Sequence, residues 1–237
     1  MKWRRRVFNA PGLTQSPPGP YLSTLARKHA RTIRVSSPKF DNIGEVLNSM
    51  AVEFEQFTGD YDCDLLFINC GTSDRFDPQA LHEFVRQGGC LYASDLTSSL
   101  MESVAPGLFH FNGSGAAGLV DASIVDPELR EVLGEHTKIT FDMGGWSMLD
   151  RCQGEILVAA APGSLYAGRP LMVGVELGEG AIFYTSFHNR AQVSGQERAL
   201  LQLLVLKQIG SFMNISLTQA SNSVGVNLQD VKLLAKG

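Results

Sequence analysis

The sequence predicts an α/β domain built on a doubly wound, mostly parallel sheet. Residues 64–70 and 90–94 are nearly continuous apolar runs, which is the composition of strands that helices cover on both faces. Between them, the segment from Pro78 to about Gln87 places leucine, phenylalanine and valine on one helical face and stops at a Gly-Gly pair. Strand, helix and strand at this spacing favour a right-handed crossover between parallel strands.

The remaining elements follow from the same signals of periodicity, caps and turns. Before the first apolar run we expect a strand at 32–35, a helix at 43–50 with Asp41-Asn42 as its N-cap, and a strand at 51–57. After the second run we expect a helix at 96–104, a flexible glycine-rich loop at 113–118, a strand at 118–125, a helix at 126–133, and strands at 139–143 and 156–160. A C-terminal hairpin at 171–175 and 181–186 and a helix at 195–212 complete the domain.

The composition divides the chain into three parts. We expect a basic, proline-containing arm at 1–31, the α/β domain at 32–213 and a polar extension at 214–237. The first 40 residues carry nine of the 20 Lys and Arg side chains and none of the 24 acidic ones. One interpretation of the arm is contact with an anionic partner, and the other is a solvated tail. No continuous apolar run follows the first arginines, which argues against a secretory signal and leaves a transit peptide as an alternative.

Hydropathy and cysteine usage favour a cytoplasmic protein without a membrane span. The longest apolar candidate, 199–209, is shorter than the roughly 20 residues that cross a bilayer. It predicts a helix that either faces the core or supports a homodimer. Cys63, Cys70, Cys90 and Cys152 form no C-x-x-C pair, so we interpret them as free thiols in a reducing compartment.

Three segments occur in an order that points to a known superfamily. They are YDCDLLFINCG at 61–71, LHEFVRQGGCLYA at 81–93 and GEGAIFYTSFHN at 178–189. Together they resemble the class I glutamine amidotransferase-like superfamily, and within it the trehalose-utilisation (ThuA-like) branch. The likeness covers residues 33–212 and implies a flavodoxin-like fold whose active site lies where a central strand turns sharply into a helix.

The sequence departs from that superfamily at the nucleophile. Glutamine-hydrolysing members carry a cysteine in a Gly-x-Cys-x-Gly turn, and the matching stretch at 93–97 reads Ala-Ser-Asp-Leu-Thr. Asp95 therefore stands in the place of the cysteine, and a carboxylate is a much poorer acyl acceptor than a thiolate. His188 matches the catalytic histidine, but Arg190 stands where a glutamate usually orients it. The resemblance thus implies a member that is not an amidotransferase.

Asp95 and His188 are the catalytic candidates that the resemblance assigns. Asp95 is interpreted as a general base, metal ligand or nucleophile, or else as a helix N-cap. His188 is interpreted as the partner base of Asp95 or of Ser94, or else as a polar strand-end residue held by a backbone carbonyl. Acidic residues such as Asp142 and Asp150 show no metal-ligand spacing, and we expect no metal or cofactor. The residues expected to line the cleft at the strand ends are Asn69, Gly71, Thr72, Ser94, Asn189 and Arg190.

Three hypotheses of function remain open at the level of sequence. The first is a module that binds an unknown small molecule or protein partner through a degenerate cleft around Asp95 and His188. The second is a hydrolase or lyase of a small, carbohydrate-like substrate that uses the two residues as an acid/base pair. The third is an adaptor whose basic arm carries the binding. The second rests on the ThuA-like resemblance alone, because a fold does not fix a function.

Overall fold

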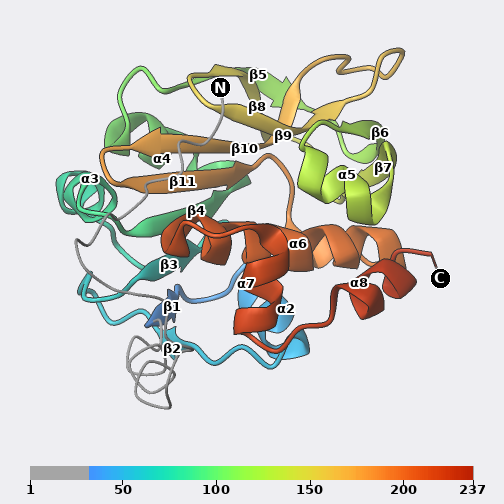
Figure 1. Cartoon of the computed structure of the whole chain (residues 1–237). Coiled ribbons are helices and arrows are strands. Elements are labelled where there is room, and N and C mark those ends of the chain that lie inside the picture. Colours follow the sequence, from blue (N-terminus) through green and yellow to red (C-terminus); the bar gives the residue numbers. More distant parts are fainter. Residues whose placement is uncertain (1–31, 237) are drawn as a thin grey trace.

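The computed structural model describes residues 32–236 (Figure 1). They form a nine-stranded sheet, a separate two-stranded sheet and the helices that pack around them. The basic arm at 1–31 lies outside the described residues, so its interpretations stay predictions. The strands are β1 (Ile33–Val35), β2 (Glu55–Gln56), β3 (Leu65–Ile68), β4 (Cys90–Ser94), β5 (Phe109–Gly115), β6 (Gly118–Ile124), β7 (His136–Phe141), β8 (Trp146–Cys152), β9 (Glu155–Ala160), β10 (Pro170–Leu177) and β11 (Gly180–Thr185). The helices are α2 (Ile43–Ser49), α3 (Pro78–Arg86), η1 (Asp95–Thr97), α4 (Ser98–Val104), α5 (Pro127–Leu133), η2 (Asn189–Ala191), α6 (Gly195–Met213), α7 (Leu217–Ser223) and α8 (Leu228–Leu234).

The sheet has a parallel half and an antiparallel half. Its strand order is β2-β1-β3-β4-β11-β10-β9-β6-β7. The strands from β2 to β11 pair in parallel, and those from β11 to β7 pair antiparallel. The predicted C-terminal hairpin is β10 and β11, and β11 extends the parallel half beside β4. The carboxyl ends of β3, β4 and β11 therefore meet at one edge of the sheet, where ligands bind in folds of this kind.

Helices cover both faces of the parallel half, as the doubly wound prediction requires. On β4, Cys90 and Tyr92 point into the core that α2, α5, α6 and α7 close, whereas Leu91 and Ala93 point into the core under α3 and α4. This alternation along one strand explains why the segment reads as a continuous apolar run. Helix α3 begins at Pro78, after Asp77 accepts hydrogen bonds from the backbone of its first turn.

The glycine-rich segment at 113–118, which we predicted to be a loop, is largely strand. It forms the end of β5, which pairs antiparallel with β8 in a separate two-stranded sheet. Gly115 is needed there, because a Cβ atom would overlap the indole ring of Trp146 on the opposite strand. The strand predicted at 51–57 is also shorter than expected, because only Glu55 and Gln56 pair with β1.

The leucine-rich helix α6 faces the core. Its side chains between Ala199 and Ile209 are mostly inaccessible, so the core-facing alternative explains the pattern that also suggested a homodimer. Helices α7 and α8 of the polar extension pack against α6. Within residues 32–236, no single helix has the length and hydropathy of a membrane span. Only α6 and α7 taken together reach those values, and a 95° bend separates them.

Replacing Gly180 with alanine should destabilise the fold at the start of β11. An added Cβ atom would overlap the backbone carbonyl oxygens of Gly89 and Val85, which cannot move like a flexible side chain. Overpacking of this kind lowers the free energy of unfolding by roughly 1–3 kcal/mol. We expect a loss at the upper end of this range for Gly180→Ala, because the atoms in the way belong to the backbone. Gly144→Ala is the matched control, because its Cβ atom would come no closer than 3.8 Å to another residue. Urea unfolding measures the stability of both variants. Equal urea midpoints for Gly180→Ala and Gly144→Ala would contradict the prediction.

Glu197 should contribute stability that disappears in acid. Its carboxylate accepts hydrogen bonds from Thr140 Oγ1 at 2.6 Å and from the Ser194 backbone at 2.9 Å, within the capping box that begins α6. Burial alone would raise the pKa of Glu197, but these hydrogen bonds lower it below its ordinary value. A folded-state pKa below the unfolded one gives stability that is complete above the unfolded pKa and is lost as the pH falls through the folded pKa.

Glu197→Gln should therefore lower stability at pH 7 and flatten its decline between neutral pH and about pH 3. The exposed residue Glu131 provides the control variant Glu131→Gln. Urea unfolding measured across this range distinguishes them, and parallel pH profiles for wild type and Glu197→Gln would refute the assignment.

Candidate active site at the carboxyl ends of the central strands

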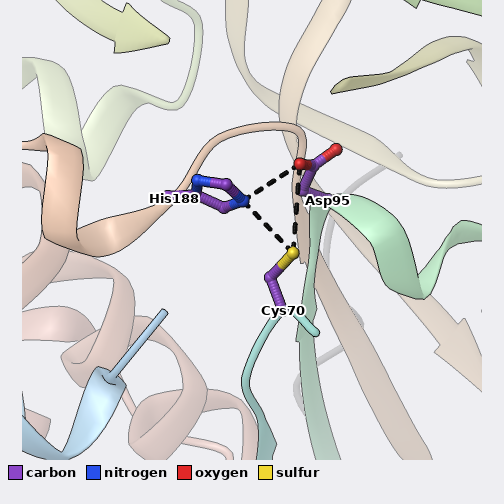
Figure 2. A group of neighbouring side chains, drawn as sticks. All are labelled: Cys70, Asp95 and His188. Atoms are coloured by element: carbon purple, nitrogen blue, oxygen red, sulfur yellow. Dashed lines mark hydrogen bonds and ion pairs between the residues drawn. The ribbon is translucent and has the colours of Figure 1, made fainter. Parts of the chain in front are cut away.

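Three buried side chains converge where β3, β4 and β11 end (Figure 2). Cys70 follows β3, Asp95 follows β4, and His188 lies three residues after β11. His188 Nε2 is 3.0 Å from Asp95 Oδ2 and 3.2 Å from Cys70 Sγ, and the sulfur is 3.9 Å from the same carboxylate oxygen. Cys70 has no accessible surface, and Asp95 and His188 are 3% and 4% exposed. The topology thus brings a thiol, a carboxylate and an imidazole to one point.

A second carboxylate holds the other ring nitrogen of His188. Asp142, just beyond β7, places its Oδ1 atom 2.9 Å from His188 Nδ1, and its side chain is 42% exposed. Burial alone would lower the pKa of His188, but hydrogen bonds with Asp95, Cys70 and Asp142 raise it to about 11. The two carboxylates thus favour the protonated form of the imidazole. Asp142 is therefore the carboxylate that holds the His188 ring at Nδ1. The sequence pattern places Arg190, not a carboxylate, at the position expected to do this.

Asp95 lies in a strained backbone conformation. Its φ angle is +38°, a region that few residues other than glycine adopt, and it directly follows the buried strand β4. Asp95 Oδ1 accepts a hydrogen bond from Ser147 N at 2.8 Å, and Tyr184 Oη donates to the Asp95 backbone carbonyl at 2.8 Å. No helix-capping hydrogen bond involves this side chain, so the N-cap interpretation is wrong. The alternative that a backbone carbonyl holds the His188 ring is also wrong, because both ring nitrogens contact side chains.

Asp41 anchors the backbone that directly follows His188. Its Oδ1 atom accepts hydrogen bonds from the backbone of Asn189 at 2.7 Å and Arg190 at 3.3 Å, and its Oδ2 atom accepts one from Ser94 Oγ at 2.7 Å. Burial, partly offset by these hydrogen bonds, raises the pKa of Asp41. Asn42 of the predicted pair occupies the N-cap position of α2, without a side-chain capping hydrogen bond. The Asp41 side chain instead joins the end of β4 to the turn after β11, so Asp41 is a positioning residue.

The residues predicted to line a cleft have different environments. Asn69 and Ser94 are inaccessible; Asn69 accepts a hydrogen bond from Ile43 N, and Ser94 donates to Asp41. Asn189 is also buried, whereas Arg190 is exposed and pairs with Glu45 on α2. Gly71 and Thr72 are half-buried in the loop after Cys70.

An aromatic ring shields this loop and the imidazole. Phe40 packs against Gly71, where a Cβ atom would collide with its ring. The same ring stacks on His188, with the ring centroids 6.4 Å apart. Phe40 and Gly71 thus account for part of the burial of His188 and Cys70.

Sequence reasoning did not assign Cys70, Asp142 or Asp41 to the site. Cys70 ends an apolar run and looked like an inert core thiol, although a reactive group at the carboxyl end of a central strand was an available signal. Asp142 comes from the antiparallel half, 46 residues before His188, and no spacing rule connects the two.

Neither a protein-family model nor a curated protein sequence matches the chain. Solved structures do match. A glutamine amidotransferase from Thermotoga maritima aligns over 87% of this chain and 95% of its own, with 10% identity and a TM-score of 0.50. A ThuA-like protein from Parabacteroides merdae aligns over 78% and 90%, with 13% identity and a TM-score of 0.53. A β-galactosidase from Bacillus circulans aligns over 79% of this chain but 32% of its own, with 10% identity and a TM-score of 0.53.

These similarities define the class of fold. The chain shares the α/β fold of the glutamine amidotransferase and the ThuA-like protein, in agreement with the flavodoxin-like fold that the sequence predicts. At identities this low the likeness concerns the fold alone, so the chemistry has to be argued from the side chains.

Proposed function

We propose that this protein is an enzyme that hydrolyses or eliminates a bond in a small substrate and is not a glutaminase. One observation carries the proposal: His188 is held through both ring nitrogens by carboxylates, one of which belongs to the strained residue Asp95. Strained backbone, buried charge and a strongly shifted pKa gather at functional sites more often than elsewhere. A module that only binds a partner has no evident need for this combination.

The side chains argue against glutamine hydrolysis. Asp95 lies at the strand-to-helix turn where the resemblance places a nucleophilic cysteine, and a carboxylate is a poor substitute for a thiolate in acyl transfer. Cys70 does lie 3.2 Å from His188 Nε2, but it follows a different strand and has no accessible surface. We therefore infer no acyl-enzyme on either residue.

The pair is suited to proton transfer. An imidazolium donates a proton to a leaving oxygen or nitrogen, and an adjacent carboxylate accepts one from water or from a C–H or O–H group. Asp142, with 42% of its side chain exposed, is the member of the cluster that is open to solvent. The fold neighbours include a β-galactosidase and a ThuA-like protein, which supports a carbohydrate-like substrate as the first class to examine.

A panel of chromogenic glycosides, esters and small amides, with L-glutamine included, tests the proposal. We expect turnover of at least one small substrate, no release of ammonia from L-glutamine, and loss of the turnover in Asp95→Asn. Glutamine hydrolysis by the wild type, or turnover that Asp95→Asn retains in full, would contradict it.

A binding module is the second candidate, favoured by the small exposure of Asp95 and His188. It predicts that a panel member or its hydrolysis product shifts the melting temperature of the wild type without being consumed. The same shift should be lost in Asp142→Asn, because Asp142 is the exposed member of the cluster. Binding without turnover across the panel would select this candidate over the enzyme.

A further inference from the structure

We propose that Cys70, Asp95 and His188 form a binding site for a divalent transition metal ion, with Zn²⁺ as the best fit. The ligand atoms are Cys70 Sγ, Asp95 Oδ2 and His188 Nε2. The inference rests on the same site as the proposed function, but metal binding is measured without any substrate, so either can fail alone.

The separations of the three atoms match the edges of a tetrahedral zinc site. With bonds of about 2.3 Å to sulfur and about 2.0–2.1 Å to nitrogen and oxygen, tetrahedral geometry places ligand atoms roughly 3.3–3.6 Å apart. The observed separations are 3.0 Å for Nε2 to Oδ2, 3.2 Å for Nε2 to Sγ and 3.9 Å for Sγ to Oδ2. Shifts of a few tenths of an ångström place all three at bonding distance from one ion.

The hydrogen bond that the Cys70 thiol donates to Asp95 Oδ2 is long, at 3.9 Å. His188 Nε2 carries at most one hydrogen, yet it faces both the Cys70 sulfur and the Asp95 carboxylate. A divalent cation bonds all three at once, and its charge balances a thiolate and a carboxylate in a region with almost no accessible surface. A metal ion binds the deprotonated thiolate and the neutral imidazole, so any proton on Cys70 Sγ or His188 Nε2 passes to solvent on binding.

The surrounding side chains hold the donors in the orientation that a metal requires. Asp142 contacts His188 Nδ1 at 2.9 Å, the carboxylate–histidine arrangement that orients a ligating imidazole and directs Nε2 to the ion. Ser147 N donates to Asp95 Oδ1 at 2.8 Å, so that the other carboxylate oxygen, Oδ2, faces His188 and Cys70. The strands β3, β4 and β11 are hydrogen-bonded neighbours, so the sites of attachment are rigid.

The donor set selects the metal and the kind of site. One thiolate, one imidazole and one carboxylate suit Zn²⁺, whereas Mg²⁺ and Ca²⁺ prefer oxygen ligands. Three protein ligands leave one tetrahedral position for water or a substrate oxygen, as in catalytic rather than structural zinc sites. In the metal-bound protein Asp95 and His188 would be ligands. The water or substrate oxygen at the fourth tetrahedral position would then take part in the acid–base chemistry in their place.

The test is metal binding by the full-length, untagged chain after treatment with a chelator. Zn²⁺ is titrated in competition with a chromophoric chelator, and Co²⁺ is added to report a thiolate-to-cobalt charge-transfer band. We expect one Zn²⁺ per chain and a Co²⁺ band, both lost in Cys70→Ser and His188→Gln. Asp142→Asn, at a half-exposed position, should bind roughly 10–100-fold more weakly.

Cys90→Ser is the matched control, because Cys90 is a buried thiol on β4 that is no part of the cluster. It should bind Zn²⁺ like the wild type. Absence of stoichiometric binding to the wild type, or equal loss in Cys90→Ser and Cys70→Ser, would overturn the inference. Turnover of a substrate by a wild type that binds no Zn²⁺ would overturn the inference while leaving the proposed function intact. Zn²⁺ binding without turnover of any substrate would do the reverse.

Discussion

His188→Gln is expected to lower turnover of any substrate that the wild type converts by about 10²–10⁴-fold, the usual contribution of general acid–base catalysis. Glutamine retains much of the size of the imidazole but cannot carry its charge between Asp95 and Asp142. Whether His188 donates a proton or binds a metal, the loss should appear in kcat more than in KM. Steady-state kinetics with the wild type and the variant measure it directly.

His82→Gln is the control for this substitution. His82 is on α3, and its ring nitrogen contacts the Val104 carbonyl at 2.7 Å, away from the cluster. We expect turnover close to that of the wild type. A similar loss in both variants, or a small loss in His188→Gln with an unchanged circular dichroism spectrum, would remove His188 from the centre of the mechanism.

Lys207→Ala is expected to give the largest loss of stability, about 3–5 kcal/mol. Lys207 Nζ lies 2.8 Å from both Asp126 Oδ2 and Glu128 Oε2, and the Lys207 and Asp126 side chains are only 10% and 6% exposed. Burial alone would lower the pKa of Lys207, but the two carboxylates raise it above its usual value. Removal of the ammonium leaves Asp126 buried without its partner charge.

The position of Lys207 explains why the effect should be global. Asp126 also accepts from Leu129 N at the start of α5, and Glu128 accepts from Leu217 N at the start of α7. Lys207 on α6 thus connects three helices. Lys138→Ala, which removes an exposed ion pair with Asp121, should change stability by less than about 1 kcal/mol. Chemical denaturation of both variants measures the difference, and equal small losses would show that the Lys207 pairs are dispensable.

The sequence allowed the parallel half of the fold to be predicted because burial on both faces leaves a local signature. The run at 90–94 is apolar throughout, since β4 has a core on each side. β5 leaves no such signature: it contains Gly, Asn and Ser, most of its residues are not buried, and its partner β8 begins more than 30 residues later. Pairing over that distance depends on tertiary contacts that local composition does not encode.

The site was predictable only in part, for a related reason. Asp95 and His188 could be assigned because they stand at positions that the resemblance marks. Asp142 reaches His188 because the segment after β11 contacts β7 at the far edge of the sheet, where Phe187 packs against Phe141. Spacing along the chain does not reveal this contact. Asp41 was assigned to the nearest helix and does accept a hydrogen bond from Asn42 N, but its other hydrogen bonds come from residues distant in sequence, namely Ser94, Asn189 and Arg190.

The central claim is that residue 95 occupies a reactive strand-to-helix turn beside His188, and Asp95→Cys tests it most directly. In a Cys70→Ser background, we would measure the rate of alkylation of residue 95 by iodoacetamide at pH 6.5. An imidazolium 3.0 Å from the Asp95 carboxylate should stabilise the new thiolate and make its alkylation more than about tenfold faster than that of the partly exposed thiols Cys63 and Cys152. His188→Gln should abolish the advantage; a thiol at position 95 that reacts no faster than those two would contradict the account.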